Sequence, residues 1–279
     1  MAGRFSNSFA LVKASADVLR LDKELMVFPL MSGVATVLVA ASFIAPIFMI
    51  GPQIFVEGES ASYAAYALGF AFYLVQYFVI FFFNAALVGA ALIRLDGGDP
   101  TVSDGLAIAA KRAGSILGYA AIAATVGMVL RFIAERAGFL GRIVVGMIGL
   151  AWTLTTYLTV PILVTKDIGP VDAVKESVAI FKRTWGEQVV GNFGMGLAVS
   201  LMAISWTCVG FFMIWLTASV GAFALVPAIA IMVLGYVFLA LFASALNGIY
   251  TAALYRYAIT GDTGYFDPQF MGNAFRPKK

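Results

Sequence analysis

The chain has 279 residues, of which 62% are hydrophobic and 12% are charged, and its mean hydropathy is +0.94. This composition excludes a soluble protein and predicts that most of the surface lies in lipid, because a soluble domain needs far more charge to cover its surface. The sequence has no histidine and a single cysteine, Cys208, which excludes imidazole metal sites, histidine-assisted nucleophiles and an internal disulfide. A net charge of +3 without a basic stripe gives no support to nucleic-acid binding.

The first predicted element is an amphipathic helix at the N-terminus. In the stretch RFSNSFALVKASADVLRLDK, apolar residues recur at helical spacing from Phe5 to Leu19, while Lys13, Asp17 and Arg20 face away. Because a membrane span follows directly, we expect this helix to lie flat at the membrane interface.

Six apolar runs follow, and each is long enough to cross a hydrocarbon layer of about 30 Å. None contains Asp, Glu, Lys or Arg, and they cover approximately residues 26–50, 63–93, 114–130, 143–165, 188–216 and 222–255. The first run is too long for the core of a cleaved signal peptide. We therefore predict six retained transmembrane helices and a single membrane domain over residues 1–279.

Short echoes between the runs predict an internal repeat. The linker PTVSDGLAIAAKR (100–112) matches PVDAVKESVAIFKR (170–183) with a one-residue slip, and both open with a proline and an acid and end on a basic pair. Two of the runs end in similar sequences, AALIRLDGGDP (90–100) and AALYRYAITGD (252–262). The predicted fold class is an all-α integral membrane protein with three repeats, each an interfacial amphipathic helix followed by a transmembrane hairpin. The repeat units are about 1–95, 96–166 and 167–261, with a cytoplasmic tail at 262–279.

The distribution of basic residues predicts the orientation. All 18 Lys and Arg lie on the side of both termini except Arg131, Arg136 and Arg142, which are in the loop between the third and fourth runs. Positive charge favours the cytoplasm, so we expect both termini to be cytoplasmic, with the 131–142 loop as the exception to the rule.

Basic residues on the three amphipathic segments are candidate contacts for anionic lipid headgroups, each adding about 1 kcal/mol at the surface. These are Lys13, Arg20, Lys111, Arg112, Lys182 and Arg183. The alternative is that they only orient and anchor the chain. Asp104 and Asp172 stand at the start of amphipathic helices, where an acid caps free N–H groups; a metal-binding or catalytic pair is the other interpretation.

Neutral polar residues inside the runs are the remaining candidates for chemistry. Asn84, Asn192 and Asn247 each lie nine or ten residues from a basic residue at the cytoplasmic end, which places them about 14 Å inside the membrane. The full candidate polar pocket comprises Asn84, Thr155, Thr156, Thr159, Asn192, Ser244 and Asn247. Such side chains also join membrane helices to one another, and both interpretations stay open.

The leading functional hypothesis is a non-enzymatic pathway or pocket for a small solute, ion or lipid. Proton coupling is not expected, because the spans lack carboxylates. The alternative is a membrane-organising or scaffold protein that binds lipid or a partner protein and transports nothing. We predict no cofactor, metal or catalytic residue. The predicted partners are membrane lipids, a second copy of the chain, or a membrane or cytoplasmic protein.

Several stretches together carry a resemblance: DAVKESVAIFKRTWG before a membrane span, AALYRYAITGD, and then FDPQF and NAF. They resemble an uncharacterised prokaryotic multi-pass family, a domain of unknown function distantly similar to the membrane-anchor region of some glycerophosphodiester phosphodiesterases. The resemblance implies a bacterial or archaeal cytoplasmic (inner) membrane and the same helical plan. It carries over no catalytic residue, because the phosphodiesterase's catalytic domain has no counterpart in this sequence.

Overall fold

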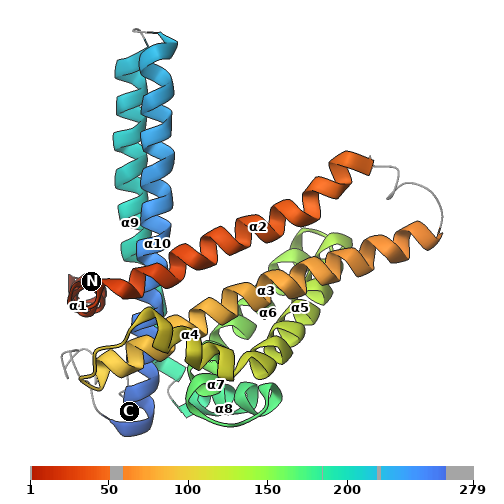
Figure 1. The fold of residues 1–279 in the computed structure, drawn as a ribbon, viewed down its shortest axis with the longest axis vertical. Helices are drawn as coiled ribbons and strands as arrows, with labels where there is room; N and C mark the ends of the chain where they lie inside the picture. The colour runs from red at the N-terminus through yellow and green to blue at the C-terminus, as the bar shows by residue number, and fades with distance from the viewer. Residues whose placement is uncertain (1, 51–58, 184, 219–220, 262–279) are drawn as a thin grey trace.

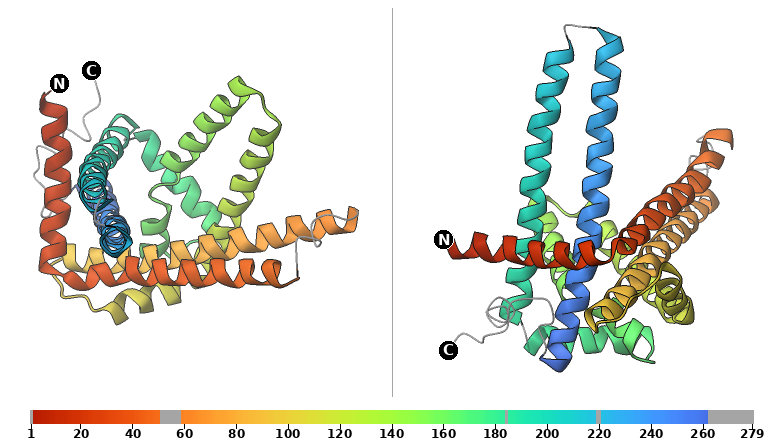
Figure 2. Two further views of the ribbon diagram at one scale, coloured as in Figure 1. Left: turned by 90° about the horizontal axis from the view of Figure 1, so that it is seen from above. Right: turned by 60° about the vertical axis from the view of Figure 1, so that its left-hand side comes forward.

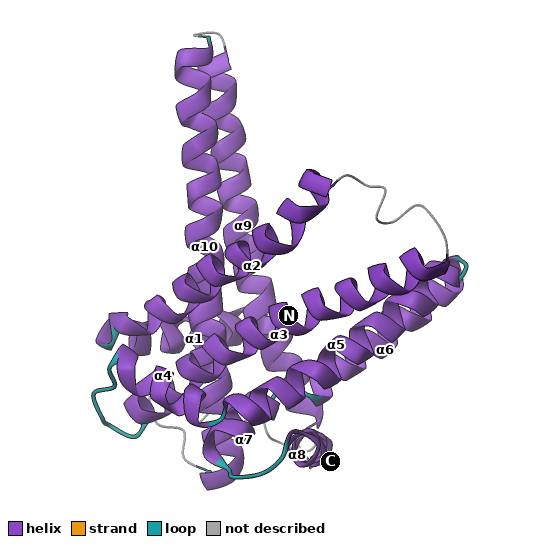
Figure 3. Cartoon of the chain, turned by 45° about the vertical axis from the view of Figure 1, so that its right-hand side comes forward, coloured by secondary structure: helices purple, strands orange, loops and turns teal. Residues whose placement is uncertain are grey.

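The computed structural model describes residues 2–50, 59–183, 185–218 and 221–261, with side chains described within 11–45, 66–182, 195–218 and 223–261. Every regular element in these ranges is a helix, joined by short loops and turns (Figure 3). The all-helical prediction is therefore confirmed for this part of the chain. The predicted tail at 262–279 lies outside the described residues.

Long apolar helices account for most of the chain (Figure 1). They are α2 (Val27–Ile50), α3 (Glu59–Leu95), α5 (Ala113–Arg136), α6 (Phe139–Thr155) with α7 (Thr159–Thr165), α9 (Trp185–Ala218) and α10 (Ala222–Thr260). Within the described residues, six stretches are long and apolar enough to cross a membrane, counting α6 and α7 as one. The multi-pass prediction is confirmed, although α5 runs on through Arg131 to Arg136, beyond the charge-free run, because long basic side chains reach water from a helix end.

Shorter helices precede each pair of long ones along the chain. They are α1 (Ala2–Leu21) with the 3₁₀ turn η1 (Lys23–Met26), α4 (Val102–Lys111) and α8 (Pro170–Arg183). α1 packs against α9 and α10 and runs across them (Figure 2). This order agrees with the expected alternation of one short and two long helices, while the origin of the three units as copies of one repeat stays a prediction.

The start of α4 is capped by side chains, as the position of its acid predicts. The Thr101 hydroxyl accepts from the Asp104 N–H at 3.2 Å, and the Asp104 carboxylate accepts from the Thr101 N–H at 2.9 Å. The hydrogen bonds from the Thr101 hydroxyl and N–H hold the pKa of Asp104 below its usual value. Glu24 of η1 adds a further bond by accepting from the Val102 N–H at 2.9 Å, which attaches the first short segment to the second.

Arg94, at the end of α3, is held by two carboxylates. Its guanidinium lies 3.5 Å from Asp22 and 2.5 Å from Asp99. The Asp22 side chain is almost fully buried, and burial raises its pKa against the opposing effect of the Arg94 charge. The arginine of the first matching motif, AALIRLDGGDP (90–100), therefore makes its ion pairs within the protein.

Arg256 in α10 behaves in the same way. It lies 3.1 Å from the Asp96 carboxylate and donates to the Leu95 carbonyl at 2.6 Å. Arg112, between α4 and α5, pairs with Asp167. An ion pair thus joins each of these helix ends to a neighbouring element. We infer that these arginines position the helices relative to one another rather than bind lipid headgroups.

The core lies where these helix ends converge, around α3. α3 packs against α2, α4, α5, α7 and α10, and presents a run of buried and mostly small residues from Ala85 to Ala91. From this base the hairpins α2–α3, α5–α6 and α9–α10 diverge, so that their tips lie far apart (Figures 1 and 2). The outer parts of α9 and α10 have large exposed apolar side chains, including Trp215 and Phe223, which are 71% and 95% exposed.

Candidate functional site

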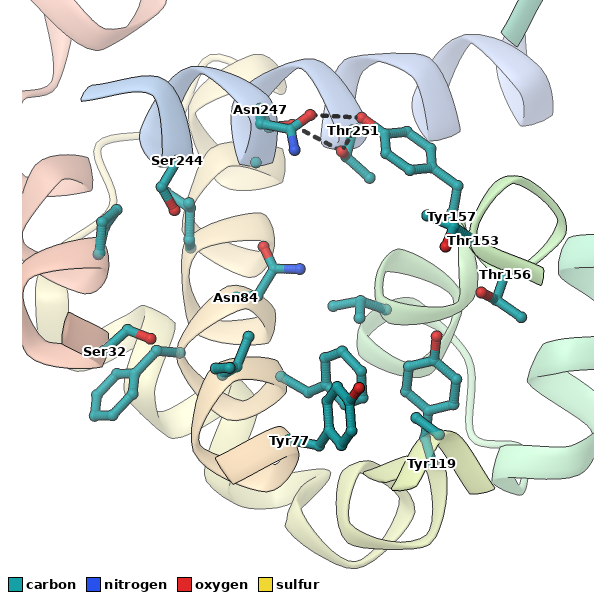
Figure 4. Close-up of a pocket in the computed structure, with 18 of the residues that line it drawn as sticks. Ser32, Tyr77, Asn84, Tyr119, Thr153, Thr156, Tyr157, Ser244, Asn247 and Thr251 are labelled. Atoms are coloured by element: carbon teal, nitrogen blue, oxygen red, sulfur yellow. Dashed lines mark hydrogen bonds between the residues drawn. The ribbon is translucent and has the colours of Figure 1, made fainter. Parts of the chain in front are cut away.

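A cavity of about 460 Å³ lies between α3, α5, the α6–α7 junction and α10, with the start of α2 at its side (Figure 4). Among the described residues that line it, none is charged. Its polar residues are Ser32, Tyr77, Asn84, Tyr119, Thr153, Thr156, Tyr157, Ser244, Asn247 and Thr251. The rest of the wall is aromatic or aliphatic, as is usual for a small-molecule pocket with a few polar groups.

One wall is organised by hydrogen bonds between α10 and the fourth span. The Tyr157 hydroxyl donates to Asn247 Oδ1 at 2.7 Å. The Thr251 hydroxyl lies 2.8 Å from the Tyr157 hydroxyl and 2.7 Å from the Asn247 carbonyl, so its one proton serves one of them at a time. Because the Asn247 oxygen is occupied, its amide N–H₂ group is the part left for a ligand.

The facing wall is Asn84 of α3, and a glycine brings it close. A Cβ at Gly248 would lie 2.3 Å from Leu87 Cδ2 and 3.7 Å from Asn84 Oδ1, so α10 approaches α3 as closely as glycine allows. Within the described part of the chain the Asn84 amide makes no hydrogen bond, and it points into the cavity (Figure 4). Both amides can therefore offer donors to one ligand.

An aromatic stack closes the side towards α5. The rings of Tyr77 and Phe81 lie 5.6 Å apart, and those of Phe81 and Tyr119 lie 4.6 Å apart, in both cases nearly parallel. Such offset stacks restrict ring rotation, and the hydroxyls of Tyr77 and Tyr119 face the cavity (Figure 4).

The fourth span is broken at the cavity. α6 ends at Thr155 and α7 begins at Thr159. Pro161 contributes to the break, because it has no N–H to bond the Tyr157 carbonyl four residues before it. The break turns Thr156 and Tyr157 towards the cavity, in agreement with the rule that irregular backbone in a membrane lines a cavity or is buried in protein.

Ser177 of α8 satisfies two backbone groups that the break leaves open. Its hydroxyl donates to the Thr155 carbonyl at 2.7 Å and accepts from the Leu158 N–H at 3.2 Å. Ser177 is 1% exposed, so no solvent could replace these bonds. The surface helix α8 is thereby coupled to the shape of the cavity.

Of the seven residues predicted for the polar pocket, the cavity wall contains Asn84, Thr156, Ser244 and Asn247. Thr155 and Thr159 flank the break but are not in the wall: the Thr155 hydroxyl bonds back to its own helix, and Thr159 is fully buried. The Asn192 side chain lies outside the described residues. Whether the wall binds a ligand stays a prediction.

Sequence reasoning missed the tyrosines of this site. Tyr77, Tyr119 and Tyr157 stand in apolar runs, where an aromatic side chain is typical of helix packing. One signal was present: Tyr157 is adjacent to the threonine cluster TLTT and four residues before Pro161, where a proline disturbs the preceding turn.

The predicted headgroup contacts fall into two groups. Lys13, Lys111 and Lys182 are exposed, and Arg20 is exposed beside Asp17. The Arg112 side chain is only 15% exposed and pairs with Asp167, so its charge is matched within the protein. The Arg183 side chain lies outside the described residues.

The comparisons give a family and no activity. Residues 63–266 match DUF6159, a family of unknown function. The chain belongs to this family. The matched region includes every cavity element from α3 to α10 and begins after α2. No curated protein matches the sequence. In the described part of the chain, no cluster of three or more His, Cys, Asp or Glu side chains could hold a metal ion.

Proposed function

We propose that the cavity binds a small, uncharged polar solute and that this DUF6159 protein provides a non-enzymatic pathway for it across the membrane. The observation that carries the proposal is a pair of facing amides, Asn84 and Asn247, in a cavity whose described lining has no charge. Moving a charged ligand from water into a low-dielectric site is costly when no side chain compensates its charge. An uncharged polyol or amide exchanges its water contacts for amides and hydroxyls.

Proteoliposome flux tests the proposal. The probes are urea, glycerol and erythritol, whose entry is followed by light scattering after rapid mixing. We expect flux of at least one probe above that of empty vesicles, and a loss of roughly tenfold or more in the double variant Asn84→Leu/Asn247→Leu. Thr125→Leu is the matched control, since its exposed hydroxyl bonds only within α5. Unchanged flux in the folded double variant, or none in the wild type, contradicts the proposal.

The second candidate is a membrane-organising protein, favoured by the exposed apolar faces of the α9–α10 hairpin. Its partner would be lipid, a second copy of the chain or another membrane or cytoplasmic protein, with Lys13, Lys111 and Lys182 at anionic headgroups. The mass of the protein in mild detergent and the identity of co-purifying lipids or proteins distinguish this candidate. A discrete oligomer or a retained partner, with no solute flux, supports it.

Both candidates place the protein in the cytoplasmic membrane of a prokaryote with cytoplasmic termini. The support is the charge distribution and the resemblance noted in the sequence. The similarity to phosphodiesterase membrane anchors belongs to the same proposal. It implies an architectural relation without catalytic residues.

A further inference from the structure

The interface between α3 and α5 leads from the cavity towards the α5–α6 tip (Figure 3). On the α5 side, the cavity wall contains Tyr119, Ala123 and Gly127, which follow one another at intervals of four residues. Arg131 comes one further turn along the same face of the helix, and its side chain is exposed. About 6 Å of helix therefore separates the cavity wall at Gly127 from the charged residues of the tip.

Aromatic rings continue the cavity wall outward on α3. The Tyr77 ring, which lines the cavity, is stacked on the Tyr73 ring, with 6.3 Å between their centroids. A Cβ at Gly127 would lie 3.4 Å from Tyr77 Oη, so a side chain at this position would crowd the hydroxyl. The glycine therefore keeps the outer end of the cavity open beside the Tyr77 ring.

A hydrogen bond joins α3 to α5 directly beyond this open end. The Arg131 guanidinium donates to the Tyr73 hydroxyl at 2.6 Å, and the Glu135 carboxylate accepts from the same guanidinium at 2.9 Å. The side chains of Arg131 and Glu135 are 64% and 58% exposed. Because exposed groups exchange such bonds readily with water, the contact between Tyr73 and Arg131 can open without loss of the surrounding packing.

We propose that the bond between Tyr73 and Arg131 is the outer gate of the cavity. When the bond is formed, the phenol and the guanidinium close the interface one turn beyond Gly127. When it opens, an uncharged solute passes between them over the Tyr77 ring, while Glu135 keeps the guanidinium paired. The gate rests on the proposed function, because it supplies the exit that a pathway through this cavity requires.

Cysteine reactivity of the full chain in lipid nanodiscs tests the gate without any solute. In a Cys208→Ala background, Gly127→Cys is treated with hydroxyethyl methanethiosulfonate, a small uncharged reagent that is present at both membrane faces. A thiol reacts as its thiolate, so it reacts where water reaches it and not where it faces hydrocarbon. We expect Gly127→Cys to react, and Tyr73→Phe to raise its rate roughly threefold or more, because the gate loses its hydrogen bond.

Two matched variants control the measurement. Ala123→Cys adds only a sulfur one turn deeper in the same wall, and it should show the same dependence on Tyr73→Phe. Gly146→Cys lies on an exposed face of α6, where its Cβ would meet nothing within 4 Å, and it should stay unreactive in lipid. Unreactive thiols at both wall positions, or rates that Tyr73→Phe leaves unchanged, overturn the gate.

Solute flux separates the gate from the pathway. In the proteoliposome assay, Gly127→Leu should lower the flux of the transported probe roughly tenfold by narrowing the passage, and Gly146→Leu should leave the flux unchanged. Flux that Gly127→Leu does not reduce contradicts this exit, and it leaves the proposed function intact if the double amide variant still loses flux. Labelling that depends on Tyr73, without flux in the wild type, supports the gate and contradicts only the pathway.

Discussion

Glycine residues determine how closely the helices approach one another at the base of the molecule. A Cβ at Gly105 of α4 would lie 2.5 Å from Phe28 Cζ and 2.7 Å from the Ala86 carbonyl oxygen. The carbonyl belongs to the backbone of α3 and the Phe28 ring is fully buried, so neither can move cheaply. The buried face of the amphipathic helix α4 therefore packs closely against α2 and α3. Only its opposite face is available to lipid or water.

Gly105→Ala should consequently destabilise the protein by about 1–3 kcal/mol, the usual cost of overpacking, despite the better helix propensity of alanine. A lower unfolding temperature, or a lower denaturant concentration at the midpoint of unfolding, measures this destabilisation. Gly114→Ala is the control, since its Cβ would meet nothing within 4 Å, and it should be neutral or stabilising. Equal effects of the two substitutions would show that α4 does not pack on α3 in this way.

At the scale of elements, the fourth span couples a surface helix to the membrane interior. Besides the Ser177 bonds, Lys166 after α7 lies 2.5 Å from Glu176 of α8, and this hydrogen bond raises the Lys166 pKa. A proline such as Pro161 by itself kinks or bends a helix, because it removes one N–H and crowds the preceding turn. The structure has a full interruption instead, because α8 supplies partners for the freed backbone groups.

Ser177→Ala should therefore loosen the junction. It leaves the Thr155 carbonyl and Leu158 N–H buried without partners, and we expect a loss of about 2–4 kcal/mol in the free energy of unfolding. Hydrogen exchange of amides near residues 156–160 should increase. Ser205→Ala is the matched control, because that hydroxyl bonds only to its own helix, and it should change stability by less than about 0.5 kcal/mol.

At the scale of the whole molecule, the hairpins leave a common base and separate towards their tips (Figure 1). The base contains the ends of α3 and α10 and the helices α4 and α8, while the α5–α6 tip lies at the far end (Figure 3). The basic residues at that tip are partly matched: Arg131 bonds Glu135 at 2.9 Å, and Arg136 lies over the Phe132 ring. Because their charges are partly compensated at the tip, these arginines are weaker evidence against the predicted orientation than uncompensated arginines would be.

Cysteine labelling in whole cells checks this orientation. In a Cys208→Ala background, Lys111→Cys and Lys182→Cys should react with a membrane-impermeant maleimide only after the cells are opened. Gly138→Cys, at the α5–α6 tip, should react from outside. Reaction of all three from one side would contradict the placement of the base and this tip on opposite membrane faces. The native Cys208 is exposed in α9, which is why it must be removed.

The sequence by itself determined the positions of the six spans and of the amphipathic segments. In lipid every backbone N–H and C=O must be bonded internally, so a charge-free run of about 20 apolar residues has little choice but to form a helix. Charges mark the ends of such runs for the same reason. The sequence also placed Asn84 and Asn247 at similar depth, since depth depends only on distance along a helix.

Tertiary structure alone decided which side chains share a cavity. The depth of a residue in the membrane follows from its distance along the helix. The direction in which its side chain faces depends on how a uniformly apolar helix is rotated against its neighbours. The sequence therefore could not distinguish Tyr77 and Tyr119 from tyrosines that only pack between helices. Thr155 and Thr156 are adjacent, yet only Thr156 lines the cavity, because the helix ends between them and Ser177, 22 residues beyond Thr155, holds that end. A contact of that kind depends on two distant segments meeting, and no local pattern contains it.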